Sequence, residues 1–368
     1  MTKTVKANPK RIWSPVRQQA ADSYLILMIV AFAVTVIVTR LFLELSGYPQ
    51  IGGGGTYHIA HLLWGGLLLF IALVMILTWA NHWVLWFAAI AGGIGVGLFI
   101  DEVGKFITSS NDYFFPLAFP IIYAFLLVCV WFYLRVRRAR PRDTRTLLYH
   151  ALEDLKQVLD YDLDPFERIE LVRELNLVIQ KTRDPNEANL ARALLAFVQA
   201  EGTRLAKEPN TLERWWGWAK FVAARWPARR VFKGLLIAGF ALTAVSTIFE
   251  VGGLIAWANG VLNGLNVPGY VIVNGKSQYA VTDPTLLVVY QVSNVVAGLL
   301  LGLAAILMGM GKERRGLRFA SLGLVLSLTV VDLLTFYFSQ LYAVGDALTQ
   351  LLLLFGATIY RWRFFLNG

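Results

Sequence analysis

Eight long apolar runs, separated by polar segments, dominate the hydrophobic pattern of the chain. Each run has about 20 residues, the length that an α-helix needs to cross roughly 30 Å of hydrocarbon. The pattern predicts membrane-spanning helices at 24–46, 57–79, 83–101, 114–134, 232–257, 285–309, 317–338 and 341–360. We therefore expect an all-α, polytopic membrane protein whose first apolar run is a retained helix and not a cleaved signal peptide.

Composition supports the membrane class. Hydrophobic residues make up 57% of the 368 residues, and charged residues only 16%, whereas soluble domains carry about 25% charged residues. A soluble helical protein would need a core too large for this chain length. The one cysteine, Cys129, lies in an apolar run, so no disulfide framework is expected.

The basic residues are distributed unevenly between the two sides of the predicted membrane. Four loops on one side hold only Lys105 and Lys276 as basic residues; these loops cover 47–56, 102–113, 258–284 and 339–340. Apart from Arg40 in the first span, the other Lys and Arg fall on the opposite side. The positive-inside rule then predicts cytoplasmic N- and C-termini. This pattern explains the net charge of +10 and indicates the lipid bilayer, not nucleic acid, as the partner.

The two halves of the chain resemble each other. Tyr57-His58-Ile59-Ala60-His61 opens the second span, and Tyr290-Gln291-Val292-Ser293-Asn294 lies in the sixth. In the same comparison Glu44 corresponds to Glu250, and Asp101 to Asp332. Chance similarity between Leu-rich helices is the alternative. We expect two parallel four-helix repeats, 1–134 and 232–368.

The segment 135–231 between the halves is polar and is predicted to be a cytoplasmic insert. Asp164-Pro165-Phe166-Glu167 and Asp184-Pro185-Asn186-Glu187 are typical of capped helix starts. Apolar residues at helical spacing follow, so two or three amphipathic helices are expected. A tryptophan cluster mixed with basic residues predicts a helix lying on the membrane surface, although these aromatics would also suit the core of the insert; the cluster comprises Trp215, Trp216, Trp218 and Trp226.

Polar side chains near the outer ends of the spans form the candidate site. They are Glu44, His58, His61, Asp101, Glu102 and Lys105 in the first half, and Glu250, Gln291, Asn294 and Asp332 in the second. A charge inside hydrocarbon costs about 2.5–3.5 kcal/mol on insertion scales, so acids at one depth imply pairing, water or a bound cation. Arg40 and Glu44, four residues apart, suit an intrahelical ion pair.

Several functions fit these residues. An outward-facing polar site would bind or move a small cation, a proton or a polar solute. Alternatively, His58, His61 and Asp101 would hold a divalent metal ion, with Glu102 as general base of a membrane-embedded enzyme. A third hypothesis is a non-catalytic subunit, or a homo-oligomer, whose insert docks partners. Interfacial side chains that merely reach water are the alternative to any site.

One stretch resembles a known group of proteins. The stretch is Gly97-Leu98-Phe99-Ile100-Asp101-Glu102-Val103-Gly104-Lys105-Phe106 followed by Asn111-Asp112-Tyr113-Phe114-Phe115, together with Gly47-Tyr48-Pro49-Gln50 and His58. It is similar to a group of uncharacterised multi-pass bacterial membrane proteins. The resemblance implies a bacterial inner-membrane location and carries no activity or functional residue with it.

Overall fold

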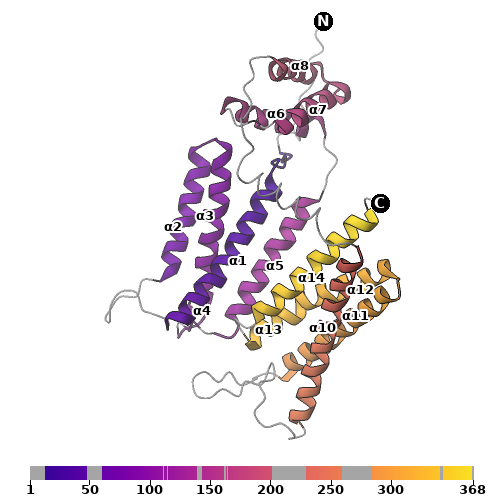
Figure 1. Cartoon of the computed structure of the whole chain (residues 1–368). Helices are drawn as coiled ribbons and strands as arrows, with labels where there is room; N and C mark the ends of the chain where they lie inside the picture. The colour runs from indigo at the N-terminus through magenta and orange to yellow at the C-terminus, as the bar shows by residue number, and fades with distance from the viewer. Residues whose placement is uncertain are drawn as a thin grey trace. The chain divides into compact units, whose positions relative to one another are not determined.

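The computed structural model describes residues 13–47, 60–110, 112–113, 115–138, 143–160, 163, 165–200, 229–258, 284–339 and 343–366. Every regular element in these ranges is a helix (Figure 1). Eight of the helices are long and apolar enough to cross a membrane. The prediction of an all-α, multi-pass membrane protein is therefore confirmed.

The first half of the chain supplies four of these spans. Its elements are α1 (Ala21–Ser46), α2 (His61–Thr78), α3 (His82–Asp101), the short α4 (Val103–Ile107) and α5 (Ala118–Arg137). The second half supplies the other four. Its elements are α10 (Arg229–Ala258), α11 (Pro284–Gly309), α12 (Glu313–Leu326), the π-helical η2 (Ser327–Val331), α13 (Asp332–Ser339), α14 (Ala343–Arg361) and the π-helical η4 (Trp362–Leu366). The segments α12, η2 and α13 together form one span.

Large apolar side chains cover the outside of the spans. Phe42, Leu77 and Phe249 are each more than half exposed, as are many other Leu, Val and Phe side chains on these helices. In water such a surface would be a strong aggregation liability. In a bilayer it faces lipid tails and has no comparable cost, which explains why the helices are apolar on all sides.

Contacts divide the chain into two compact units. The first comprises 1–32, 66–96 and 130–221, and the second comprises 33–65, 97–129 and 222–368. The spans α1, α2, α3 and α5 each contribute one part to each unit. The candidate polar residues described below all lie in the second unit.

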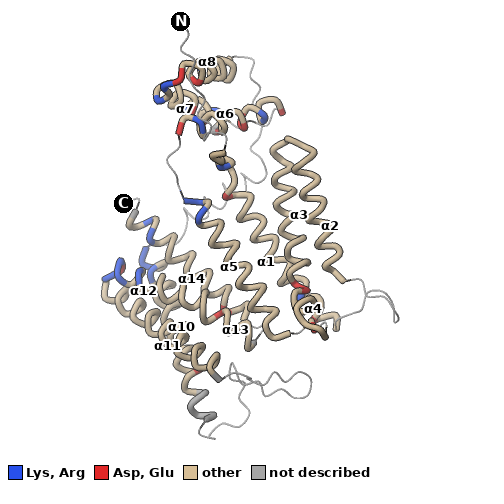
Figure 2. The backbone as a smooth tube through the Cα atoms, turned by 180° about the vertical axis from the view of Figure 1, so that it is seen from behind, with Lys and Arg blue, Asp and Glu red and all other residues tan. Residues whose placement is uncertain are grey.

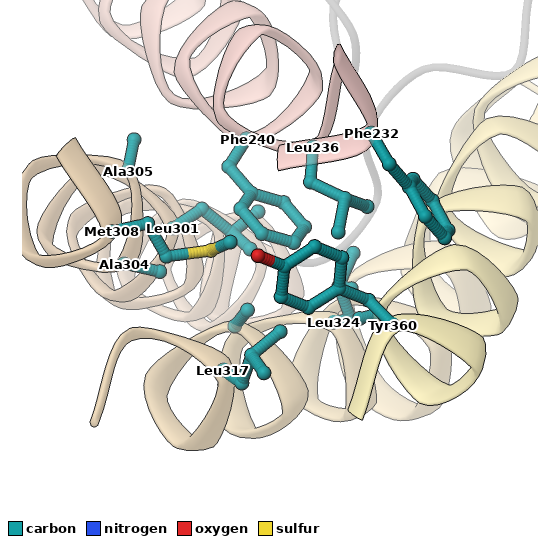
Figure 3. Packing of buried hydrophobic residues seen from close by; sticks show 12 residues of the cluster. Phe232, Leu236, Phe240, Leu301, Ala304, Ala305, Met308, Leu317, Leu324 and Tyr360 are labelled. Atoms are coloured by element: carbon teal, nitrogen blue, oxygen red, sulfur yellow. The ribbon is translucent and has the colours of Figure 1, made fainter. Parts of the chain in front are cut away.

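The second unit is built around an apolar core between α10, α11, α12 and α14 (Figure 3). Phe240 from α10, Leu301 and Met308 from α11, Leu324 from α12 and Tyr360 from α14 are fully buried in it. Glycine lets these helices approach closely, because a Cβ atom at Gly316 would meet the Ala304 carbonyl oxygen at 2.9 Å.

Charged residues join three helix ends of the second unit. The Glu313 carboxylate on α12 accepts hydrogen bonds from Arg229 of α10 at 2.8 Å and from the Tyr360 hydroxyl of α14 at 2.9 Å. Lys233 pairs with the same carboxylate at 3.2 Å. Figure 2 shows Lys and Arg along the neighbouring ends of α12 and α14. The starts of α10 and α12 and the end of α14 therefore share one side, as predicted from the charge distribution.

The first unit packs α1 closely against α3. A Cβ atom at Gly93 would lie 2.4 Å from the Met28 carbonyl oxygen, so only glycine fits this crossing without a shift of the backbone. Nearby, the Tyr24 hydroxyl of α1 and the His82 Nε2 of α3 are 2.7 Å apart. Together these contacts hold α1 against α3.

The same unit contains three amphipathic helices, α6 (Thr144–Leu159), α7 (Pro165–Lys181) and α8 (Pro185–Gln199). They bury a common apolar cluster that includes Leu171, Leu175 and Val198. The Asp184 side chain caps α8 by accepting from the Asn186 N–H at 2.9 Å, as its Asp-Pro sequence predicts. Asp164 and the Trp215, Trp216, Trp218 and Trp226 cluster lie outside the described residues.

Candidate functional site

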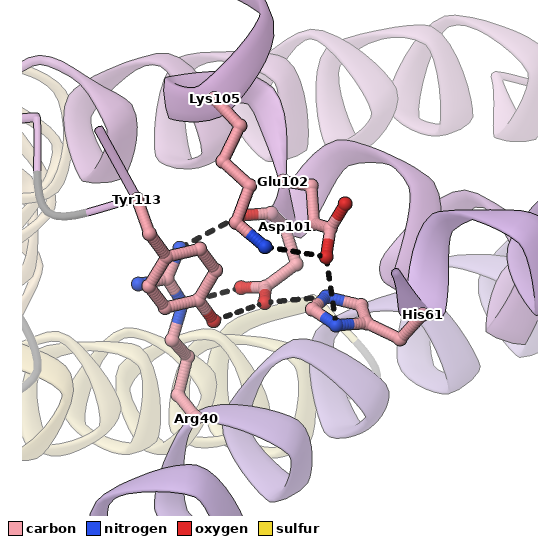
Figure 4. A network of polar contacts seen from close by, with 6 residues as sticks. All are labelled: Arg40, His61, Asp101, Glu102, Lys105 and Tyr113. Carbon is pink, nitrogen blue, oxygen red and sulfur yellow. Dashed lines mark hydrogen bonds and ion pairs between the residues drawn. The ribbon is translucent and has the colours of Figure 1, made fainter. Parts of the chain in front are cut away.

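Six polar side chains of the second unit form a connected network, the six-residue network (Figure 4). They are Arg40 of α1, His61 of α2, Asp101 of α3, Glu102 between α3 and α4, Lys105 of α4, and Tyr113 before α5. The network thus draws on every membrane span of the first half except α5, and it lies at the ends of those spans that the charge pattern predicts to be outer.

Local structure explains how α3 presents two adjacent acids. α3 ends at Asp101, and Glu102 (φ −89°, ψ 10°) joins it to the single turn α4. The negative end of the helix dipole disfavours carboxylates at this point. Two cations, Arg40 and Lys105, compensate for this unfavourable position.

The loop after α4 places Tyr113 over the network. The Thr108 hydroxyl donates to the Gly104 carbonyl oxygen at 2.8 Å and accepts from the Asp112 N–H at 2.7 Å. A Cβ atom at Gly104 would lie 2.7 Å from the Asp112 carbonyl oxygen. The loop therefore folds tightly onto α4 because residue 104 lacks a side chain.

Asp101 is the centre of the network and is fully buried. Its Oδ1 accepts from Arg40 Nε at 2.5 Å, and its Oδ2 accepts from the Tyr113 hydroxyl at 2.6 Å. His61 Nε2 lies 3.1 Å from the same Oδ2. Arg40 Nη2 also donates to the Asp101 backbone carbonyl oxygen at 2.7 Å. Every oxygen of this residue therefore has a donor, which is the condition for burying a carboxylate.

Arg40 is held between aromatic rings as well as by its acid. Its guanidinium carbon lies 3.9 Å from the centroid of the Tyr113 ring and 4.6 Å from that of Phe119. Only 2% of its side chain is exposed. Stacking on two rings and ion pairing together offset the cost of removing this cation from water.

His61 bridges the two acids. Its Nε2 faces Asp101, and its Nδ1 lies 3.1 Å from Glu102 Oε1. About a fifth of the side chain is exposed, at 22%, whereas both carboxylates are almost fully buried. A neutral imidazole has one N–H donor and one bare nitrogen, so only the doubly protonated ring presents a donor to both carboxylates.

Glu102 completes the network on the other side of His61. Lys105 Nζ lies 3.1 Å from Glu102 Oε1, the oxygen that also faces His61. The second oxygen, Oε2, is buried and has no hydrogen-bond partner among the described residues. It is an acceptor available to a proton or to a water molecule.

Two further polar groups lie in the second half. Glu250 of α10 accepts from the Asn294 amide of α11 at 2.7 Å and from the Tyr290 hydroxyl at 3.4 Å. Asp332, the first residue of α13, accepts from the Gln350 amide of α14 at 2.8 Å. Glu250 thus bonds within the second half and Asp101 within the first, whereas Asp332 also has Tyr123 of α5 in the first half as a neighbour.

The structure brings together four of the predicted site residues, His61, Asp101, Glu102 and Lys105. It places Glu250 with Asn294 and leaves Glu44 exposed on α1. Gln291 is partly buried, and its Oε1 has no hydrogen-bond partner among the described residues. His58 lies outside the described residues.

The expected ion pair between Arg40 and Glu44 is replaced by another. Arg40 pairs with Asp101 of α3 instead. Spacing along one helix indicates which side chains are neighbours on that helix, but it contains no information about a buried acid on an adjacent helix. A buried partner at the same depth outcompetes an exposed one because the Coulomb attraction is stronger in a low dielectric.

Tyr113 and Gln350 are absent from the sequence-based list of site residues. Tyr113 was given no site role from the sequence, yet it donates to Asp101. Gln350 is a lone amide within an otherwise apolar run. Polar residues inside membrane spans often mark functional sites, and this rule would have identified Gln350.

The metal hypothesis remains a prediction, because His58, one of its three proposed ligands, lies outside the described residues. Among the residues that the structure describes, no group of three or more His, Cys, Asp or Glu side chains that could hold a metal ion is found.

Comparisons with protein-family models, curated proteins and solved structures find no match to the chain.

Proposed function

We propose that this membrane protein binds a proton at His61 and passes protons, alone or coupled to a small cation or polar solute, through the six-residue network. One observation carries the proposal: the His61 ring lies between the buried carboxylates of Asp101 and Glu102, with each ring nitrogen 3.1 Å from a carboxylate oxygen. An imidazole between two acids is a suitable proton relay, because it can take a proton from one side and release it to the other.

Charge balance identifies His61 as the group that gains and loses the proton. Arg40 offsets the charge of Asp101, and Lys105 offsets that of Glu102. Protonation of His61 therefore adds a positive charge to a network that is otherwise neutral. It also gives the second ring nitrogen a hydrogen, so that both ring nitrogens attract the carboxylates that they face. Loss of the proton leaves one bare nitrogen against a carboxylate, which favours uptake of the next proton.

The exposure of the network supports a direction of access. His61 and Lys105 are partly exposed, at 22% and 23%, whereas Asp101 and Glu102 are buried. A proton therefore reaches the network through His61. The buried Glu102 Oε2, which has no hydrogen-bond partner among the described residues, is the next acceptor.

We also infer the arrangement in which this site operates. The order of four spans, the helices α6 to α8 and four further spans supports two parallel repeats separated by an insert. The shared side of the α10, α12 and α14 basic ends supports a cytoplasmic insert and cytoplasmic termini. On this arrangement the six-residue network faces the outside of a bacterial inner membrane.

Proton flux across vesicles tests the proposal. The purified protein is reconstituted with a pH-sensitive dye inside, a pH step is imposed, and the initial rate of dye response is measured. His61→Gln keeps a polar side chain of similar reach but cannot carry a second proton. We expect it to slow the protein-dependent flux by about 10²-fold, the lower range of what a positioned acid–base group contributes.

His82→Gln is the matched control. His82 also lies at a span end and bonds a tyrosine, Tyr24, but it belongs to the first unit and not to the six-residue network. We expect this variant to retain the wild-type flux. Wild-type vesicles no faster than protein-free vesicles, or a His61→Gln flux equal to wild type, would refute the proposal.

A further inference from the structure

The second half buries a carboxyl–amide pair inside its membrane spans. Asp332 is 1% exposed and Gln350 is 8% exposed. Gln350 Nε2 donates to Asp332 Oδ1 at 2.8 Å. The other oxygens of the same two side chains, Asp332 Oδ2 and Gln350 Oε1, are buried acceptors without a hydrogen-bond partner among the described residues. If Asp332 is an ionised carboxylate and Gln350 a neutral amide, neither side chain supplies a hydrogen to these two acceptors. The pair therefore requires one more hydrogen atom.

Among the described residues, no hydrogen bond to Asp332 Oδ2 is found. The Tyr123 hydroxyl of α5 lies within hydrogen-bonding reach of Asp332, and its one proton is donated to the Leu328 carbonyl oxygen in η2 at 2.7 Å. Because a hydroxyl has one hydrogen, Tyr123 engaged in this way leaves Asp332 Oδ2 without a donor.

Among the described residues, no positively charged side chain pairs with this carboxyl group. Asp346, one turn before Gln350 on α14, is an acidic neighbour of Asp332 and also of Glu250. In the described part of the chain, no Lys, Arg or His forms an ion pair with any of these three acids. An ionised Asp332 would therefore be a buried charge facing like charges within a membrane span, which is the least favourable state of a carboxyl group.

We propose that Asp332 binds a proton on Oδ2 and forms a carboxylic acid–amide pair with Gln350. The proton turns Oδ2 from an acceptor without a partner into a donor, with Gln350 Oε1 as its acceptor. The amide N–H already donates to Oδ1. This proton site uses helices α13 and α14, shares no residue with the six-residue network, and does not rest on the function proposed for His61.

The position of the pair gives the proton a structural consequence. Asp332 immediately follows the π-helical η2, and Gln350 belongs to the next span. π-Helical turns inside membrane helices often mark functional sites. Release of the proton would leave a charged Asp332 with one donor, Gln350, and with Asp346 as an opposing charge. The contact between α13 and α14 thus depends on the bound proton.

Infrared difference spectroscopy of the full chain tests this inference. A protonated carboxyl group has a C=O stretching band that is separate from the carboxylate bands. Asp332→Asn is the decisive variant, because its amide still supplies one donor and one acceptor and keeps the fold. We expect the wild-type minus Asp332→Asn spectrum at neutral pH to show loss of a protonated carboxyl band and no loss of a carboxylate band.

Asp346→Asn is the matched control, since Asp346 is an exposed acid on the same helix as Gln350. Its difference spectrum should show loss of a carboxylate band, with the Asp332 band retained. The band should also persist in His61→Gln, whatever the proton flux of that variant. Loss of a carboxylate band in Asp332→Asn would overturn the inference and would mean that a cation other than a proton balances Asp332.

Discussion

Asp101 shows what a buried acid requires in this protein. It accepts from a guanidinium, a tyrosine hydroxyl and a histidine, and it is fully buried. A buried ion pair need not add net stability, but removal of one partner leaves an uncompensated charge. The contribution of Arg40 therefore depends strongly on the presence of Asp101.

Arg40→Ala should lower the free energy of unfolding by about 3–5 kcal/mol, the usual cost of breaking a buried ion pair. Adding Asp101→Asn should recover part of this loss, because the second change removes the stranded charge. The free energies of unfolding of the wild type, the two single variants and the double variant, measured in one detergent, give the coupling energy.

Arg229→Ala is the control for this cycle. Arg229 also pairs with an acid, Glu313 at 2.8 Å, but half of its side chain is exposed, and Lys233 remains to pair with Glu313. Its loss should lower the stability far less than loss of Arg40 does, because an exposed ion pair contributes little. Equal destabilisation by Arg40→Ala and Arg229→Ala would show that burial does not increase the contribution of the Arg40–Asp101 ion pair to stability.

The residues of the network could be found from the sequence more readily than their partners. His61, Asp101, Glu102 and Lys105 stand out as polar residues at the ends of apolar runs. Tyr113 does not, because tyrosine is common at the membrane interface and its hydroxyl could point anywhere. Arg40 was noticed but was assigned to Glu44, since sequence spacing describes neighbours within one helix only.

At the scale of elements, the helices α6 to α8 should have a pH-dependent stability. Asp154 of α6 is buried, and this burial, together with the nearby carboxylates of Glu174 and Glu167, raises the pKa of Asp154 to about 7 against the opposing effect of a hydrogen bond with Gln19. Between about pH 4 and 7 the folded helices hold a proton that the unfolded chain has released. Their stability should therefore fall as pH rises through this window, by about 1.4 kcal/mol per pH unit.

Hydrogen exchange of α6 to α8 in the full chain, corrected for the intrinsic exchange rate, measures this dependence. Protection should decrease from pH 4 to pH 7 and then level off. Asp154→Asn should remove the slope, whereas Asp160→Asn, at the exposed end of the same helix, should retain it. A slope unchanged in Asp154→Asn would assign the pH dependence to another group.

Helix packing in the third span depends on one glycine of an adjacent pair. Gly93→Ala should destabilise the protein by about 1–3 kcal/mol, as overpacked sites do, because the new Cβ atom would meet the Met28 backbone at 2.4 Å. Gly92→Ala is the control, since its Cβ would have no atom within 4 Å. Thermal unfolding of both variants checks this, and equal midpoints would contradict the close contact between α1 and α3.

The elements themselves were largely predictable because span length is set by bilayer thickness. The eight predicted spans match the eight helices within a few residues, for example 285–309 against Pro284–Gly309. The π-helical η2 was not foreseen. Its sequence, Ser-Leu-Thr-Val-Val, is ordinary for a membrane helix, and its backbone is stabilised by a contact from another span, Tyr123 to Leu328.

At the scale of the whole molecule, the polar sites of the second unit differ in chemistry between the two halves of the chain. The first-half site carries cations and a histidine, and the second-half sites carry acids, amides and hydroxyls. The sequence indicated this difference, since Gln291 and Asn294 stand at the positions of His58 and His61. It did not indicate that Asn294 bonds Glu250 while His61 bonds Asp101, because that choice depends on how helices pack.

The central claim is that His61 carries a proton on both ring nitrogens while it bridges Asp101 and Glu102. Nitrogen NMR of histidine-labelled protein measures this directly, with His61→Gln assigning the signal and His82→Gln leaving it in place. The account predicts two protonated nitrogens for His61 in the folded protein. A His61 ring that keeps one nitrogen unprotonated at every pH at which the protein is folded would contradict it.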